Sequence, residues 1–368
     1  MSISKLSISG YKSIESISFE DIEDFSAFAG ANGAGKSNLF DAIKFASIIV
    51  ERGAILAIRE MGGFSKIHCM KRRKSAARTF SFFVEAKLHE NIWGYELSVR
   101  NMDTEPTISE KVILDGTALF ERKEGAIPRF GKEEHVSEIP NFPKDRSALM
   151  FASDILYEWL ANTKIYRIDP IGSKEPDAVN TDSSQLDEKG HNVATMLAHL
   201  EKHDEIRETI LEWMEIIAPG LESVATETQR LDSKTVLTFK ESGFKARFPA
   251  NLISDGTIYS LCILTAVLSR KNSLGLTLIE EPERGINPKV IGQLTELMHD
   301  SSTNEHPIWV STHNETVVRF AKPDELFFVN KIEGRTTYKR GSDAADAVAG
   351  MPLDKAWLSN LFGGGLPW

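Results

Sequence analysis

The chain has 368 residues, of which 41% are hydrophobic and 26% are charged, a composition typical of a globular protein with one large core or two smaller ones. The formal net charge of −10 argues against a protein that coats nucleic acid with its whole surface, and the two distant cysteines, Cys69 and Cys262, argue against a disulfide framework or a cysteine metal cluster. The longest apolar stretch, near residues 258–268, is too short to cross a bilayer and the N-terminus has no apolar central region, so we expect a cytoplasmic protein without a membrane segment.

The first strong signal along the chain is the segment AFAGANGAGKSNLFDAI. It contains the phosphate-binding pattern G-x-x-x-x-G-K-[ST], between a strand-like DFSAFAG and a helix-like SNLFDAIKFASII. Glycines let the backbone wrap around phosphate oxygens, Lys36 would neutralise the β and γ phosphates, and the Ser37 hydroxyl would ligate Mg²⁺. We therefore expect nucleoside triphosphate binding. The residues expected to line this phosphate site are Gly30, Asn32, Gly33, Gly35, Lys36, Ser37 and Asn38.

A short basic segment, MKRRKSAAR, follows the phosphate-site helix. Its cations include Lys71, Arg72, Arg73 and Lys74, which could contact DNA phosphates. A solvated loop is the alternative that composition favours, because no aromatic residues are interleaved for base stacking.

Composition divides the chain into three predicted segments. Residues 1–125 alternate strand-like stretches with the phosphate loop and its helix, and form ATPase lobe I. Residues 126–220 are a loop rich in proline, glycine and charge, followed by a segment of helical periodicity. Residues 221–368, in which strand patterns return, form ATPase lobe II.

The stretch LISDGTIYSL places a polar tripeptide directly before an apolar helix. Ser254 or Asp255 is suited to cap the helix, because its side-chain oxygen accepts an unpaired amide of the first turn. Capping does not explain Gly256, since glycine weakens a first turn unless another group must approach the backbone closely.

Two carboxylates stand at the end of the next apolar strand, in LGLTLIEEPERGINP. Open α/β sheets bind ligands at the carboxyl ends of their strands, so Glu280 is predicted to hold the Mg²⁺ shell and Glu281 to polarise the attacking water. Adjacent carboxylates repel one another unless a cation intervenes, which also indicates a nearby metal.

A third strand pattern, HPIWVSTHNETVV, ends at Ser311-Thr312-His313. A lone histidine is more often structural, but this one follows the acidic strand and again lies at a carboxyl end, where it could sense a γ-phosphate. Farther on, FVNKIEG is similar to a guanine-recognition motif, but its place between two strand-like runs predicts a hairpin turn instead.

In this order the motifs resemble the RecF/SMC-like ABC-type ATPases, and more closely the short AAA-family ATPases related to the OLD and anti-phage-defence groups. The resemblance extends to GYKSIESISF, KGHNVATMLAHL and AWLSNLFGGGLPW. It implies an α/β P-loop NTPase fold, two-lobed like an ABC or SMC head, with a mixed sheet and a helical insertion. It also implies that Ser254, Asp255 and Gly256 reach the γ-phosphate held by another subunit, that Glu281 is the hydrolytic glutamate, that His313 is the switch histidine, and that Lys12 and Ser13 contact the nucleotide.

The sequence departs from the family pattern in several places. ABC ATPases carry a glutamine between the phosphate loop and the signature that coordinates Mg²⁺, yet the first glutamine here is Gln185, so that role is unassigned. The metal position is Glu280 where transporters have Asp, and the signature reads Ser-Asp-Gly where they have Ser-Gly-Gly. The sequence contains no long heptad repeat that would form the SMC coiled coil. Too few residues follow His313 for a nuclease domain like that of the larger OLD proteins.

The sequence thus predicts an ATPase that binds ATP with Mg²⁺ and forms a homodimer, or a higher even oligomer, through ATP. We expect it to regulate a separately encoded effector, in phage defence. The alternatives are a DNA-repair clamp, a nucleotide-gated scaffold with little turnover and, least favoured by the signature and the insertion, the soluble subunit of an ABC transporter.

Overall fold

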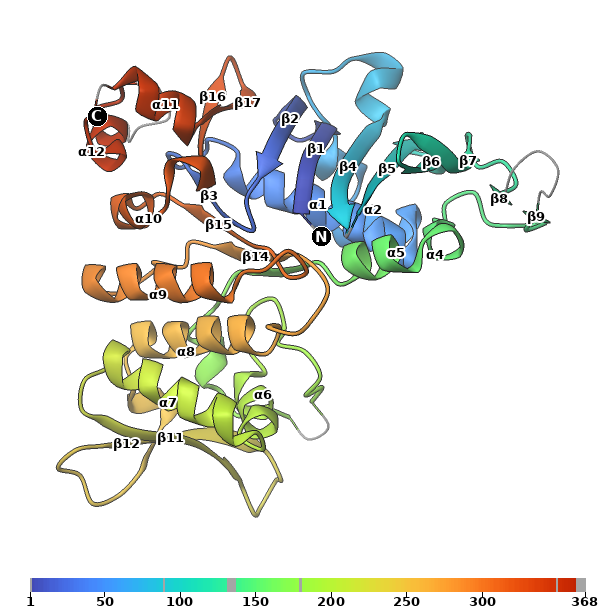
Figure 1. The fold of residues 1–368 in the computed structure, drawn as a ribbon. Helices are drawn as coiled ribbons and strands as arrows, with labels where there is room; N and C mark the ends of the chain where they lie inside the picture. The colour runs from blue at the N-terminus through green and yellow to red at the C-terminus, as the bar shows by residue number, and fades with distance from the viewer. Residues whose placement is uncertain (1, 89, 131–136, 179–180, 349, 362–368) are drawn as a thin grey trace.

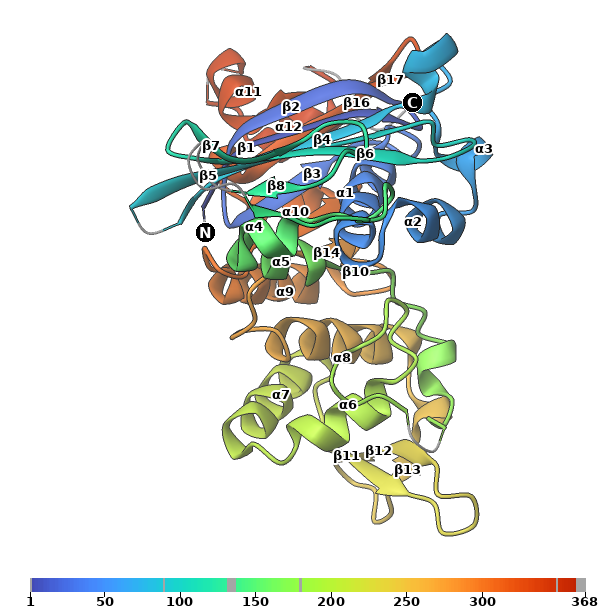
Figure 2. The ribbon, with the colours of Figure 1, turned by 90° about the vertical axis from the view of Figure 1, so that its right-hand side faces the viewer.

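The computed structural model describes residues 2–88, 90–130, 137–178, 181–348 and 350–361, arranged around three β-sheets. Figure 1 shows an upper part, with an eight-stranded and a six-stranded sheet, and a lower part, with helices and a three-stranded sheet. The view turned by 90° in Figure 2 shows the same division.

The eight-stranded sheet is antiparallel throughout, in the order β2-β1-β4-β5-β6-β7-β8-β9. In β4 the side chains of Phe80, Phe82 and Val84 are buried and alternate with more exposed residues, as expected of a sheet with one solvated face. The strands are β1 (Ser2–Tyr11), β2 (Ile14–Ile22), β4 (Phe80–Leu88), β5 (Asn91–Arg100), β6 (Thr107–Leu114), β7 (Thr117–Arg122), β8 (Arg129–Phe130) and β9 (Ser137–Glu138).

The six-stranded sheet has the order β10-β14-β15-β3-β16-β17, and all its strands are parallel except β17. The middle strands β15 and β3 are buried along their whole length, which explains why both are continuous apolar or small-residue runs. The strands are β10 (Lys164–Tyr166), β14 (Thr277–Glu280), β15 (Ile308–Thr312), β3 (Phe25–Ala29), β16 (Leu326–Ile332) and β17 (Arg335–Arg340).

Helices cover both faces of the six-stranded sheet and fill the lower part, where they pack with the three-stranded sheet β11 (Leu221–Thr228), β12 (Thr235–Glu241) and β13 (Phe248–Pro249). The helices are α1 (Lys36–Arg52), α2 (Ala54–Glu60), α3 (Phe64–Ile67), α4 (Leu149–Ala152), α5 (Asp154–Ala161), α6 (Val193–Leu200), α7 (Asp204–Ile217), α8 (Asp255–Leu268), α9 (Pro288–Ser301), α10 (Glu315–Phe320), α11 (Gly341–Ala347) and α12 (Leu353–Leu358).

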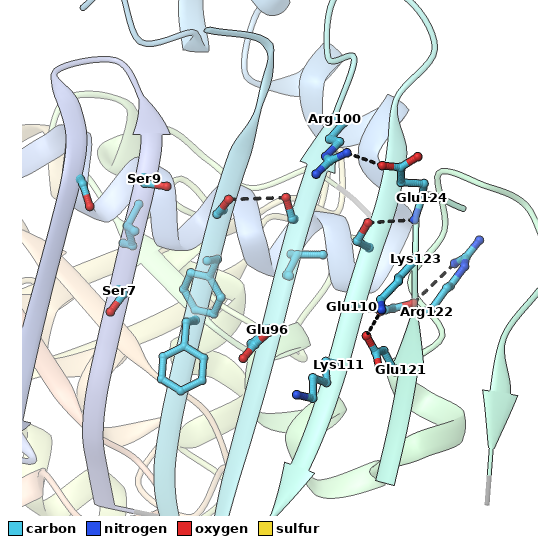
Figure 3. Close-up of a pocket in the computed structure, with 18 residues that line it drawn as sticks. Ser7, Ser9, Glu96, Arg100, Glu110, Lys111, Glu121, Arg122, Lys123 and Glu124 are labelled. Carbon is cyan, nitrogen blue, oxygen red and sulfur yellow. Dashed lines mark hydrogen bonds and ion pairs between the residues drawn. The ribbon is translucent and has the colours of Figure 1, made fainter. Parts of the chain in front are cut away.

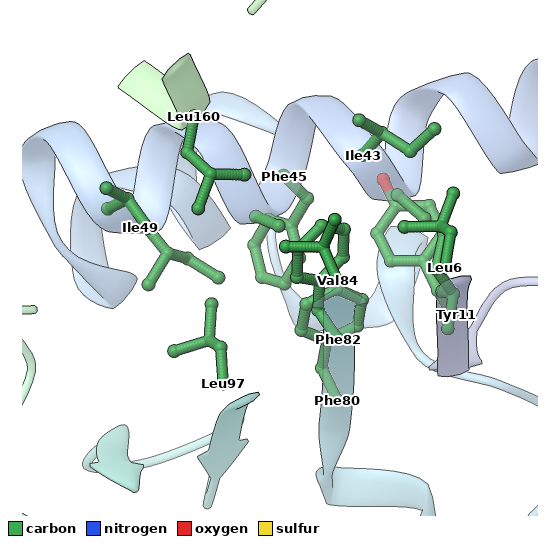
Figure 4. Close-up of a cluster of buried hydrophobic side chains, with 14 of the residues drawn as sticks. Leu6, Tyr11, Ile43, Phe45, Ile49, Phe80, Phe82, Val84, Leu97 and Leu160 are labelled. Atoms are coloured by element: carbon green, nitrogen blue, oxygen red, sulfur yellow. The ribbon is translucent and has the colours of Figure 1, made fainter. Parts of the chain in front are cut away.

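Two apolar cores hold these layers together, one on each face of the six-stranded sheet. In the first core α1 packs on the eight-stranded sheet, and the ring centroids of Phe45 and Phe80 lie 4.9 Å apart (Figure 4). Phe28 of β3 belongs to this core, whereas Ala27 and Ala29 belong to the second core with α6 to α10. The alternation follows from the period-2 geometry of a strand buried on both faces. Helix α1, which follows the phosphate loop, thus packs on the face of the sheet to which Phe28 points.

The structure confirms the α/β fold class and the predicted hairpin at FVNKIEG, since β16 and β17 pair antiparallel around Glu333 and Gly334, both with φ near +50° to +80°. Strands of the six-stranded sheet come from all three predicted segments, 1–125, 126–220 and 221–368. Of the predicted loop, residues 131–136 lie outside the described residues, as do residues 362–368 of the C-terminal motif. Among the described residues, helices are at most 17 residues long, and none is long and apolar enough to span a membrane.

The start of β14 is tied to β15 through a buried histidine. Thr277 Oγ1 accepts from Arg270 Nε at 2.8 Å and lies 2.7 Å from His306 Nε2, so the arginine and the histidine share one hydroxyl. Burial, helped by the charge of Arg270, lowers the pKa of His306 to about 4.

We predict that this histidine makes the protein less stable as the pH falls from about 6.5 to about 4. As the pH falls, the unfolded chain takes up the proton first. The contribution of His306 to the free energy of unfolding is therefore complete above its unfolded pKa and is lost as the pH approaches its folded pKa, a decrease of about 3 kcal/mol. Urea unfolding across this range should show a shallower pH slope for His306→Gln than for the unsubstituted protein. Equal slopes would contradict the assignment.

Candidate nucleotide-binding site

The phosphate loop connects β3 to α1, and two of its glycines are packed against the hairpin β16–β17. A Cβ atom on Gly35, which has a φ of +110°, would lie 2.1 Å from Thr336 Oγ1, and one on Gly30 would lie 2.4 Å from the carbonyl oxygen of Val329. A Cβ atom on Gly33, which has a φ of +81°, would have no atom within 4 Å among the described residues. The first two glycines therefore shape the loop from behind, and Gly33 leaves its front open, as a phosphate cradle requires.

The amides and the lysine of this loop are suited to an anion. Within the described part of the chain, the amides of Gly33, Gly35 and Lys36 have no backbone acceptor, as is usual at a helix N-terminus. Lys36 Nζ donates to the carbonyls of Gly30, at 2.6 Å, and Ala31, at 3.1 Å. Burial lowers the pKa of Lys36, against the opposing charges of the nearby glutamates. A phosphate would supply the acceptors that these donors need.

Strand register brings the predicted metal residues together. Glu280 ends β14, and its Oε2 accepts from the Ser37 hydroxyl of α1 at 3.1 Å. The described residues contain no cluster of three or more histidine, cysteine, aspartate or glutamate side chains that could hold a metal. A serine and one carboxylate fit a magnesium ion whose other ligands are phosphate oxygens and water. The residues that would hold Mg²⁺ are thus the two that the sequence predicts.

Glu281 lies at a strained turn beside this pair. Its φ is +50°, a conformation uncommon for any residue except glycine. The hydroxyl of Tyr259, from α8, donates to the carbonyls of Glu281, at 2.8 Å, and Glu280, at 3.1 Å. The turn is therefore held by the helix that follows the Ser-Asp-Gly motif.

His313 faces two carboxylates. Its Nδ1 lies 3.5 Å from Oε1 of Glu281 and 3.5 Å from Oε1 of Glu283. Glu283 is buried and accepts from Thr312 Oγ1 at 2.7 Å and from the His313 amide at 3.1 Å, and burial raises its pKa. Glu283 thus fixes the backbone of the histidine, a function that the sequence analysis did not assign.

A second group missed from the sequence is Arg167, the residue directly after β10. Its Nη2 donates to Glu280 Oε1 at 2.8 Å and to Asp41, and its Nη1 donates to Glu188 Oε1 at 2.8 Å. Lys12, predicted to contact the nucleotide, forms an ion pair with Asp41. The apolar run before Arg167 is only two residues long, which is too short to predict a strand from the sequence.

Ser13 and Asn38 are brought together behind the loop. Asn38 Nδ2 donates to Ser13 Oγ at 2.6 Å, and Ser13 Oγ lies 2.7 Å from Thr336 Oγ1. These contacts connect the opening strands, α1 and the β16–β17 hairpin. Thr336, which also packs on Gly35, had no sequence signal.

The Ser-Asp-Gly motif lies at the N-terminus of α8. Ser254 caps the helix, accepting from the Thr257 amide at 3.2 Å, and both Ser254 and Asp255 are exposed. Lys174 Nζ donates to Asp255 Oδ1 at 2.5 Å. A Cβ atom on Gly256 would lie 2.4 Å from the carbonyl oxygen of Gly285. The loop after the acidic pair of this same chain thus approaches Gly256 closely, and the approach of a phosphate from another subunit stays a prediction.

The basic segment lies around the short 3₁₀ helix η1 (Lys74–Arg78). Lys71 and Arg73 are exposed, but Arg72 is partly buried and donates to the carbonyl of Glu15. At least one of the four predicted DNA contacts is therefore engaged within the chain.

A hollow of about 520 Å³ lies elsewhere, on the solvated face of the eight-stranded sheet (Figure 3). Serines and charged side chains line it, including Ser7, Ser9, Glu96 and Lys111. None of the predicted phosphate-site or metal residues belongs to this hollow.

We predict that Gly256→Ala destabilises the protein by about 1–3 kcal/mol, the usual cost of overpacking. The added methyl would collide with the Gly285 carbonyl and displace the loop that carries Glu281 and Glu283. Thermal unfolding is the measurement. Alanine is the better helix former, so a variant as stable as the unsubstituted protein, or more stable, would contradict the contact.

Comparison with known proteins identifies the family and the fold. Residues 25–319 match the family described as "AAA domain, putative AbiEii toxin, Type IV TA system". Among solved structures, an SMC head bound to the C-terminal winged-helix domain of ScpA is 16% identical, with a TM-score of 0.61, over 94% of this chain and 100% of that one. The Smc head with an extended coiled coil, bound to the C-terminal domain of ScpA from Pyrococcus furiosus, is 14% identical, with a TM-score of 0.58, over 94% and 98% of the two chains.

The SMC head domain from Thermotoga maritima is 14% identical, with a TM-score of 0.50, over 92% of this chain and 99% of that one. No curated protein gave a match. At these identities the structural likeness shows the fold, and the family model covers most of the chain. The chain therefore belongs to the AbiEii-type AAA family and has the fold of an SMC-head-like P-loop ATPase.

Proposed function

We propose that this protein binds and hydrolyses ATP and closes as a homodimer, or a higher even oligomer, around the nucleotide. The observation that carries the proposal is the convergence of three predicted motifs at one edge of the parallel sheet. Ser37 of the phosphate loop contacts Glu280, and the neighbouring Glu281 lies within ion-pair distance of His313. The family and the fold support the same reading.

The proposed chemistry is positioning combined with electrostatics. The amides of the loop and Lys36 would bind the phosphates of ATP. Mg²⁺, held by Ser37 and Glu280, would offset negative charge on the phosphates when bound. Glu281 would orient the attacking water, and His313, whose backbone Glu283 holds in place, would sense the γ-phosphate.

Dimer formation is proposed from the position of the Ser-Asp-Gly motif. Ser254 and Asp255 are exposed at the N-terminus of a 14-residue helix, and the neighbouring Leu252 is 70% exposed. Lys174 neutralises the carboxylate of Asp255, which would otherwise repel a phosphate. In a symmetric dimer two such contacts form at once, so each ATP would connect the two subunits.

We predict that Lys36→Ala weakens ATP binding at least tenfold, because it removes the buried cation that faces the phosphates. Titration with a fluorescent ATP analogue is the measurement. Lys271→Ala is the matched control, since it removes an exposed lysine near the opposite end of the sheet. If Lys36→Ala binds ATP within a few-fold of the affinity of the unsubstituted protein, the assignment of the site is wrong.

We also predict that Glu281→Gln slows hydrolysis, retains ATP binding and accumulates an ATP-bound dimer. Adding Ser254→Arg should return that variant to its nucleotide-free assembly state, because a bulky side chain fills the place of the partner's phosphate. Light scattering with and without ATP and Mg²⁺ measures both effects, and the nucleotide-free sample controls for any constitutive contact. If Ser254→Arg leaves the ATP-dependent mass unchanged, the motif does not act across subunits.

The biological role is proposed from the family and from the similar solved structures. The family description includes the words "putative AbiEii toxin, Type IV TA system", which supports a system of two components. Control of a separately encoded effector, in phage defence, is the role we propose. Two of the similar heads are described as bound to domains of ScpA, which supports a protein partner for this fold. Contact with DNA would involve the exposed Lys71 and Arg73, with Lys74 beside them in sequence.

A further inference from the structure

One arginine joins three carboxylates at the edge of the candidate site. Register pairs Tyr166 of β10 with Ile279 of β14, so the residues that follow, Arg167 and Glu280, lie side by side. The Arg167 side chain is 31% exposed, and that of Glu280 is 14% exposed. The pair is thus partly shielded from water, where charge-assisted hydrogen bonds are stronger than at an open surface.

Both oxygens of Glu280 are already used in this arrangement. Oε2 accepts from Ser37 at 3.1 Å, and Oε1 accepts from Arg167 at 2.8 Å. Guanidinium has five donors and no acceptor, so Arg167 cannot ligate a cation and can only compete with one for the carboxylate. Burial alone would lower the pKa of Arg167. Its hydrogen bond to Glu280 and the charges of Glu280 and Asp41 more than offset this effect, so the pKa lies above its usual value and the group stays charged.

The same arginine also connects the site to a distant part of the predicted insertion, residues 126–220. Its Nη1 lies 2.8 Å from Glu188 Oε1, its amide donates to the Glu188 carbonyl at 2.7 Å, and Lys44 forms an ion pair with the other carboxylate oxygen of Glu188. Glu188 belongs to the segment that leads into α6. A crevice of about 340 Å³ lies between this segment and α1, so there is room for the two to move.

Helix α1 presents a polar stripe to this network. Ser37, Asp41 and Lys44 are spaced four and three residues apart, which places them on one face of the helix. Ser37 contacts Glu280, Asp41 contacts Arg167, and Lys44 contacts Glu188. A change in the contacts of Ser37 can therefore alter the neighbouring contacts of Asp41 and Lys44 in turn.

We propose that Arg167 is the internal counter-ion of Glu280: it holds this carboxylate in the nucleotide-free protein and releases it when Mg²⁺ and ATP bind. This inference rests on the proposed function and adds a positioning residue to it. Release of Glu280 leaves Arg167 paired with Asp41 and Glu188, so the exchange acts on the contact between the phosphate-loop helix and the segment that contains Glu188. That segment packs against α8, since a Cβ atom on Gly190 would lie 3.1 Å from Cys262 Sγ. In this way the state of the metal site is passed to the helix that follows the Ser-Asp-Gly motif.

The test compares the dissociation constant of a non-hydrolysable ATP analogue in EDTA with that in saturating Mg²⁺. In Arg167→Gln, Glu280 has no positive partner in EDTA, and no arginine competes with Mg²⁺ for it when the metal is present. The dissociation constant in EDTA divided by that in Mg²⁺ should therefore rise by about tenfold, the effect of one partly screened charge-assisted hydrogen bond. Lys44→Gln is the matched control. It removes one positive charge from the same network, but from a lysine that contacts Glu188, and its ratio should stay that of the unsubstituted protein.

An unchanged or lower ratio in Arg167→Gln would overturn the inference, as would an equal rise in Lys44→Gln, which would indicate general electrostatics. Loss of analogue affinity at saturating Mg²⁺ would also overturn it, because Arg167 would then act on the phosphates. Should Arg167→Gln not fold, Arg167→Lys keeps the charge without the planar fork, and its ratio should rise by less than about tenfold over that of the unsubstituted protein. A ratio equal to that of the unsubstituted protein would reject the proposal. If the unsubstituted protein fails to bind the analogue, the proposed function itself fails.

Hydrogen exchange of residues 185–192 tests the link to the segment that contains Glu188. Mg²⁺ with the analogue should change the exchange of these amides in the unsubstituted protein, and Arg167→Gln should show the changed rate without nucleotide. Identical exchange in these three states would remove the segment that contains Glu188 from the proposal.

Discussion

The register of the parallel strands β10, β14, β15 and β3 is the constraint on which the candidate site depends. These strands end at one edge of the six-stranded sheet, and the pairing aligns Glu280 with Ser311 and Thr312 with Ala29. A slip of one residue would turn each side chain to the opposite face of the sheet. The apolar residues that alternate between the two cores therefore do more than stabilise the sheet, because they also place Glu280 beside Ser37.

Those parts of the site that a short stretch of chain specifies could be predicted from the sequence. The phosphate loop needs glycines and a lysine at fixed spacing, and Glu280 and His313 follow apolar runs. The β16–β17 hairpin was predictable for the same reason, because its turn chemistry lies within a few residues. Each of these predictions needed only a local pattern and the rule that parallel strands meet ligands at their carboxyl ends.

Other parts depend on contacts between segments distant in the sequence. Arg167 lies 113 residues before Glu280, and Ser13 lies 323 residues before Thr336. No spacing rule connects such pairs, so neither Arg167 nor Thr336 could be assigned from the sequence. Gly256 shows the related difficulty: the need for a glycine is visible in the sequence, but the approach of the Gly285 carbonyl depends on tertiary packing.

The hydroxyl of Tyr259 has a consequence for how two nucleotides would be treated in an assembly. Tyr259 lies one turn into the helix that Ser254 caps, and it bonds to the carbonyls of Glu280 and Glu281 in its own chain. A ligand from a partner that pulled on the start of α8 would therefore also pull on the turn that holds both acidic residues. Occupancy of one site would alter the geometry of the other, so the two sites of a dimer would turn over cooperatively, with a Hill coefficient that departs from one.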